Sequence, residues 1–185
     1  MRPYLDSRPG GEAPGPRAAL HLPAGKAHEH TIRGRVATMT TLREGFQIEE
    51  PSVFVPWDVT EQQLRELLDP HGLRKVTYGY FTLSCRSLGG LSHELGFHFI
   101  PRNSDHLTEL EFFRARPTIE LHRSFDEFQH HLELTFGPPT RSVPGQAGFT
   151  EHRWQLPGAT IVHYVVDRFG PEEYVRIIRR EDVFA

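Results

Sequence analysis

Cysteine is almost absent from this chain of 185 residues, in which Cys85 is the only one. A single cysteine excludes an intramolecular disulfide and a metal site made of several thiolates. Long apolar runs are also missing, since no stretch approaches the roughly 18 residues typical of a membrane-spanning helix. The N-terminus lacks the apolar segment of a secretory signal peptide. These absences predict a cytoplasmic protein with no membrane partner.

An excess of positive charge is missing too. The chain has 21 Lys and Arg against 24 Asp and Glu, a formal net charge of −3. Residues 1–38 hold six basic and three acidic residues (+3), so residues 39–185 carry −3 − 3 = −6. Binding to nucleic acid relies on clustered Lys and Arg. We therefore expect no nucleic-acid partner.

Motifs that hold phosphates, dinucleotides or catalytic metals are missing as well. The chain contains no P-loop, no dinucleotide fingerprint, no Gly-x-Ser-x-Gly turn and no His-Glu-x-x-His pair. The glycine-rich turns at 88–91 and 145–148 do not lead into predicted helices, so we do not interpret them as phosphate-binding loops. We expect a protein that is not an enzyme and that carries no cofactor.

What the chain does contain begins with a biased N-terminus. Residues 1–38 hold five Pro and five Gly, a composition that disfavours helices and paired strands. We interpret residues 1–45 as a disordered tail. Met39 directly precedes the ordered pattern, and we treat it as an alternative translation start.

The rest of the chain reads as one pattern written twice. The interval from Phe81 to Leu88 equals that from Phe149 to Leu156, seven residues each. A second interval of sixteen residues separates His98 from Arg114 and recurs from His163 to Arg179. Such internal periodicity predicts a repeated structural unit.

Each unit is expected to begin with a helix and continue with three strands. Capping boxes at Thr60–Gln63 and Ser124–Glu127 start the helices, which end near Gly72 and Gly137. The predicted strands cover about 76–87, 94–101, 107–114, 149–156, 159–167 and 173–180.

These elements predict an α+β fold of two tandem units, each a helix plus a three-stranded antiparallel meander. One unit is too small to bury its sheet face alone. We therefore expect the units to pack together, with the helices on one side of the sheet or sheets. The boundaries are 46–118 for the first unit and 119–185 for the second, within one globular domain of 46–185.

Four residues are candidates for contact with a protein partner: Tyr80, Arg86, Arg153 and Trp154. Tyr, Trp and Arg dominate the binding energy of protein interfaces. Arg86 and Trp154 also occupy equivalent positions, five residues after Phe81 and Phe149. The alternative for Trp154 is a place in the hydrophobic core.

The alternative candidate site is a metal centre. His98 and His163 occupy matching positions on predicted strands, and Asp167 or Glu94 could add a third ligand. The competing interpretation is that each histidine points to the solvent side of its strand, because its neighbours are the apolar residues. We prefer that interpretation, because metal sites usually show tighter ligand spacing.

Two further features have simpler interpretations. Cys85 lies within a predicted strand without a catalytic motif, so we expect a buried structural thiol. Glu109 and Glu111 share one side of a strand and could perform acid–base chemistry. Alternating polar residues are also what a half-exposed antiparallel strand requires, and we prefer that interpretation.

The order of elements, with Thr60-Glu61-Gln62-Gln63 and Ser124-Phe125-Asp126-Glu127 opening the two helices, resembles tandem-repeat inhibitors such as the β-lactamase inhibitory protein. It also resembles small immunity proteins of bacterial toxin systems. The likeness covers residues 46–180 and concerns architecture alone. It implies a non-enzymatic protein-binding module. The alternative is a small-ligand or metal-dependent enzyme with a site between the units, and a homodimer joined at an edge strand is compatible with both.

Overall fold

The computed structural model describes residues 42–99, 105–114 and 120–180. Most of the expected tail, including Met39, lies outside the described residues. The last four positions assigned to it are described, and there Leu42 is buried in the core and Gly45 begins the first strand.

The described chain alternates short helices with antiparallel strands. In chain order the elements are β1 (Gly45–Ile48), β2 (Val53–Pro56), α2 (Glu61–Leu68), the 3-10 helix η1 (Asp69–His71), β3 (Arg74–Thr77), β4 (Tyr80–Ser87), β5 (Leu91–His98), β6 (Glu109–Arg114), α3 (Leu121–Phe136), β7 (Arg141–Pro144), β8 (Thr150–Leu156), β9 (Ala159–Asp167) and β10 (Pro171–Arg179).

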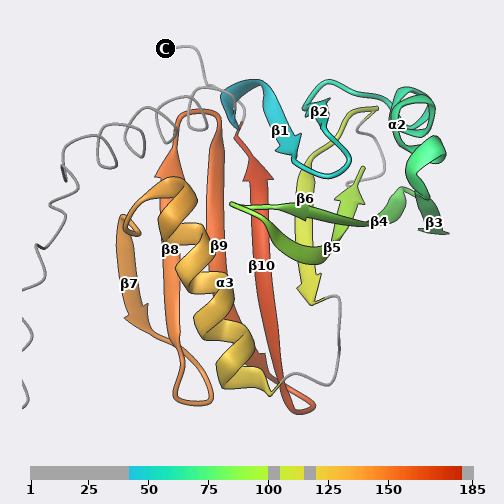
Figure 1. Cartoon of the computed structure of the whole chain (residues 1–185). Coiled ribbons are helices and arrows are strands. Elements are labelled where there is room, and N and C mark those ends of the chain that lie inside the picture. The colour runs from blue at the N-terminus through green and yellow to red at the C-terminus, as the bar shows by residue number, and fades with distance from the viewer. Residues whose placement is uncertain (1–41, 100–104, 115–119, 181–185) are drawn as a thin grey trace, which may run out of the picture.

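Eight of these strands form one sheet in the order β3-β4-β5-β6-β10-β9-β8-β7, and β1 pairs with β2 in a separate ribbon. All the pairings are antiparallel, which confirms the α+β class. The strands of the first half, β3 to β6, meet those of the second half, β7 to β10, where β6 pairs with β10. Figure 1 shows the strong twist of this sheet, with β4 and β5 running across the direction of β8 to β10.

Each helix is followed by four strands, whereas the sequence predicted three. The strands that were missed are β3 and β7, which lie at the two edges of the sheet. Their side chains are almost all exposed, so neither shows the apolar alternation by which a strand is recognised.

One hydrophobic core joins the sheet to both helices and to the β1–β2 ribbon. Figure 1 shows α3 crossing in front of β8 to β10, while α2 lies beyond β2 at the other end. Apolar side chains from α2, α3, the ribbon and the sheet belong to this core, among them Leu64, Phe136, Trp57 and Phe97. The Phe46 ring meets Phe112 edge-on at 5.6 Å, so the ribbon packs on the same sheet face as α3.

The helix starts agree with the sequence in one case and not in the other. At α2 the capping box is present: Thr60 Oγ1 accepts from the backbone N–H of Gln63, and Gln63 Oε1 accepts from that of Thr60. The expected capping box at Ser124 is wrong, because α3 begins at Leu121 after Glu120, which caps the His122 amide. Ser124 is buried inside the helix.

Candidate functional site

The two faces of the sheet differ in chemistry, because side chains alternate along every strand and paired residues share a face. The inner face, which α3 covers, carries Leu95, Phe112, Val175 and His163, paired in that order across four strands. The outer face carries the alternate residues: Tyr80, His98, Glu109, Glu111, Tyr164, Tyr174 and Arg176.

Glu111 is the centre of a polar cluster on the outer face. Its carboxylate accepts from His98 Nε2 at 2.9 Å and from Arg176 Nη2 at 2.8 Å. Arg176 Nη1 lies 3.3 Å from Glu109 Oε1. We call these four residues, together with Tyr80, the Glu111 cluster. Three neighbouring strands, β5, β6 and β10, thus hold one another through charged groups.

Aromatic rings hold the edges of this cluster in place. Tyr80 and His98 stack with ring centroids 4.3 Å apart. The Tyr80 ring has room because residue 96 is a glycine: a Cβ atom at this position would lie 2.8 Å from Tyr80 Oη. On the other side, the Arg176 guanidinium lies 5.0 Å over the Tyr174 ring, which stacks on Tyr164 at 5.4 Å.

The pKa values of the two carboxylates in the cluster are shifted in opposite directions. Burial acts to raise the pKa of Glu111, but the His98 hydrogen bond and the Arg176 charge outweigh it, so this pKa is lowered. Burial dominates at Glu109, whose pKa is raised despite the Arg176 charge. Burial, with the charge of Glu111 next, raises the pKa of Tyr80 to about 12.

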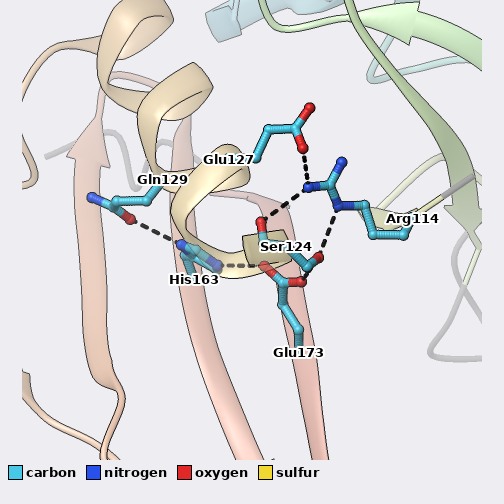
Figure 2. A network of polar contacts seen from close by, with 6 residues as sticks. All are labelled: Arg114, Ser124, Glu127, Gln129, His163 and Glu173. Atoms are coloured by element: carbon cyan, nitrogen blue, oxygen red, sulfur yellow. Dashed lines mark hydrogen bonds and ion pairs between the residues drawn. The ribbon is translucent and has the colours of Figure 1, made fainter. Parts of the chain in front are cut away.

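A second polar network lies beneath α3 on the inner face. Figure 2 shows its members, which come from β6, α3, β9 and β10: Arg114, Ser124, Glu127, Gln129, His163 and Glu173. His163 is fully buried, and Phe125 stacks on its imidazole at 3.9 Å. We call this set the α3 network.

Glu173 contacts both His163 and Ser124 and so connects the members of the α3 network. His163 Nε2 lies 2.9 Å from Glu173 Oε1, and the Ser124 hydroxyl donates to Glu173 Oε2. Arg114 Nε donates to Ser124 Oγ at 2.8 Å, and its Nη2 donates to Glu127 at 2.6 Å. The carboxylate therefore lies between the serine and the histidine, whereas nucleophilic catalysis requires direct contact between them. This geometry favours attachment of α3 to the sheet over chemistry.

A third group of polar side chains surrounds His93 in the core. His93 Nε2 lies 2.6 Å from Ser87 Oγ, and Cys85 Sγ lies 4.0 Å from the ring nitrogens. Burial lowers the pKa of His93 to about 4 and raises that of Cys85 to about 12. Cys85 is 8% exposed, which confirms that the thiol is buried.

The partner-binding candidates from the sequence divide between the two faces. Tyr80 and Arg86 lie on the outer face of β4, and Arg153 lies on the same face of β8. Arg86 is paired with Glu50, and Arg153 with Glu151. Trp154 lies on the inner face, 1% exposed, and its Nε1 donates to Gly137 O at 2.8 Å. The core interpretation of Trp154 is the one that fits, because a buried indole cannot contact a partner.

The proposed metal ligands are not brought together. Strand register places His98 on the outer face and His163 on the inner face, so one ion cannot reach both. Asp167 follows His163 by four residues, roughly 13 Å along an extended strand. Within residues 42–99, 105–114 and 120–180, no group of three His, Cys, Asp or Glu side chains could hold a metal ion.

The sequence did not identify Arg176, Tyr164 and Tyr174 as members of a site. The alternation of Tyr174 and Arg176 with Val175 and Ile177 did indicate that they face away from the core. What could not be seen was the pairing of β6 with β10, which places Arg176 directly opposite Glu111. The Glu109–Glu111 side is also more buried than expected, since the Glu111 side chain is only 7% exposed.

No helix in the described part of the chain is long and apolar enough to cross a membrane.

Comparison with known proteins found no matching family model and no matching curated protein. Among solved structures, the chain is similar to the crystal structure of a DUF4309 family protein, YjgB, from Bacillus subtilis. The two share 10% sequence identity with a TM-score of 0.46, over 80% of this chain and 97% of that one.

Proposed function

We propose that this chain is a non-enzymatic protein-binding module, of the inhibitor or immunity type, that holds a protein partner on the outer face of its sheet. The observation that carries the proposal is the Glu111 cluster with its flanking tyrosines. Apart from the buried Glu111, these side chains are partly exposed, yet each is held in place by a ring contact or an ion pair from a neighbouring strand.

This arrangement suits binding for an energetic reason. Burying charged groups in a cluster contributes less stability than apolar packing would, so the cluster is a poor device for folding alone. Rings that are already fixed lose little conformational entropy when a partner covers them. Tyr and Arg are also the residue types that carry binding energy at the centre of interfaces.

The edges of the sheet are less suited to binding than its face. Edge strand β3 carries Arg74 and Lys75 and has a register shift before Thr77. The other edge, β7, has only four residues, beginning with Arg141 and ending with Pro144. Charge, irregular register and proline all oppose pairing with another strand. We therefore favour a partner on the outer face over a homodimer joined at an edge strand.

The enzyme alternative has less support. Its motivation was a site shared by His98 and His163, and these residues lie on opposite faces. The buried histidines on the inner face, His93 and His163, are 1% and 0% exposed. A substrate could not reach either imidazole without displacement of α3 or the core.

We also infer that the two halves are repeats of one unit. The order of elements supports this, since a helix followed by four strands occurs twice and the halves join at β6 and β10. The repeat concerns the order of elements and not individual residues, because equivalent residues should share a face, whereas His98 and His163 do not. A cytoplasmic location stays a prediction.

Affinity capture with matched variants tests the binding face. The baits are the full chain, Tyr80→Ala and Tyr174→Ala on the outer face, and Leu134→Ala, an exposed residue of α3, as control. We expect a protein retained by wild type and Leu134→Ala, and reduced about tenfold or more with either tyrosine variant. Thermal unfolding must show that all baits are folded. Retention unaffected by the tyrosine variants would contradict the proposal.

A further inference from the structure

We propose that the centre of the outer face receives an arginine or lysine side chain of the partner protein, placed beside Glu109. This inference rests on the proposed function and adds the chemical class of the contact. It follows from the charges, contacts and neighbours of Glu109.

The first observation is a charge imbalance at the centre of the face. Glu109 and Glu111 bring two negative charges, and Arg176 brings one permanent positive charge that contacts both, while His98 adds a second positive charge only when it is protonated. Other ion pairs on this face join one cation to one carboxylate, as Arg74 does with Glu94. While His98 is neutral, one further cation would balance the central set.

The second observation is that the imbalance falls on Glu109. Glu111 has two donors within 2.9 Å and a side chain that is 7% exposed. Glu109 has the longer contact to Arg176, at 3.3 Å, and its side chain is 21% exposed. The raised pKa of Glu109 agrees, because burial there outweighs the charge of Arg176. An incoming cation would therefore gain most at this carboxylate.

The third observation concerns the neighbours of Glu109. Register places His98 on one side and Ile178 on the other, and both are partly exposed. Ile178 can pack against the methylene stem of an arginine or lysine while the charged end meets the carboxylate. The Tyr80–His98 stack closes the opposite side. A long basic side chain fits these surroundings better than a compact ion does.

Other cationic or charged occupants fit less well. A metal ion needs several ligands, and the described residues offer no group of three that could hold one. Nucleic acid would bring phosphates against two carboxylates. A protein side chain carries one positive charge on an apolar stem, which matches both features of the site.

The test is an NMR titration of the full-length chain with N-acetyl-arginine amide. Its matched control is N-acetyl-citrulline amide, which has the same shape without the charge. The signals followed are the Glu109 carboxyl carbon and the Ile178 methyl groups. We expect saturable shifts with arginine and none with citrulline. Binding should be roughly threefold weaker in Glu109→Gln, the size expected for a partly exposed ion pair, and unchanged in Glu133→Gln, on exposed α3 surface.

Three outcomes of the titration would overturn the inference: equal shifts from citrulline, no effect of Glu109→Gln, or no saturable shift at all. An NMR cross-peak between Glu109 and an arginine of residues 1–41, recorded without the probe, would show that this chain itself supplies the cation. That result also overturns the inference. If the titration fails while the tyrosine variants still lose the partner, the class of contact is wrong and the binding face stands. If the titration succeeds while those variants keep the partner, the cation site is present but the proposed function is wrong.

Discussion

His163 Nε2 lies 2.9 Å from Glu173 Oε1 beneath α3, where the two side chains are 0% and 10% exposed. The other ring nitrogen lies 2.9 Å from Gln129 Oε1. Protonated His163 donates to both oxygens, and neutral His163 is accommodated if the Gln129 amide turns its nitrogen toward the ring. Gln129, His163 and Glu173 thus join α3 to β9 and β10 in either state.

Replacing Glu173 by alanine should destabilise the protein by roughly 1–3 kcal/mol. The change leaves His163 and Ser124 without the carboxylate that each contacts, and buried polar groups without partners are costly. Urea unfolding measures the free energy. Glu172→Ala, an exposed neighbour, is the control and should change stability by less than about 0.5 kcal/mol. Equal effects of the two variants would show that the α3 network contributes nothing specific.

Acid should weaken the fold through His93, whose pKa falls to about 4 from an ordinary 6.5. The unfolded chain then binds a proton at higher pH than the folded chain does. The stability contributed by neutral His93 is complete above pH 6.5 and declines as pH falls toward 4, by up to about 3 kcal/mol. Urea unfolding at pH 7 and pH 4.5 measures the loss. A His93→Leu variant should lose less stability over this range, and an identical loss would contradict the assignment.

Two glycine substitutions should differ sharply in cost. In Gly45→Ala the new methyl group would lie 2.2 Å from Val55 O, a backbone atom that cannot move aside. We expect a loss of about 3 kcal/mol. In Gly96→Ala the three atoms nearest the methyl group all belong to the Tyr80 side chain, the closest being Oη at 2.8 Å. That ring can turn, so we expect a loss below about 1 kcal/mol together with a disturbed Tyr80–His98 stack. Thermal unfolding and the NMR signals of both rings check the pair.

Trp154 should matter for folding and not for recognition. Trp154→Ala is expected to cost roughly 3–5 kcal/mol, because it removes a large buried ring and the hydrogen bond to Gly137 O. Trp154→Phe keeps most of the volume and should cost less. Calorimetry measures both. If the folded Trp154→Phe protein loses its partner while Tyr80→Ala retains it, the division between core and outer face drawn above is wrong.

Local signals in the sequence located most of the elements. Thr60 and Gln63 start α2 because a capping box needs only contacts between residues three apart. Gly72 and Gly137 end their helical segments with positive φ angles of 90° and 81°. The same kind of local rule misled at Ser124, whose hydroxyl contacts Glu173, 49 residues away in β10, and Arg114 in β6. A tertiary contact there overrides the local preference.

The sequence by itself determined which residues alternate between core and solvent, and therefore the α+β class, the burial of Cys85 and most strands. Only the tertiary structure decided that β6 pairs with β10, that Glu111 meets Arg176, and that His98 and His163 face opposite sides. The reason is physical. Alternation depends on neighbours along one strand, whereas register depends on contacts between strands, and a shift of one residue would move every side chain to the other face.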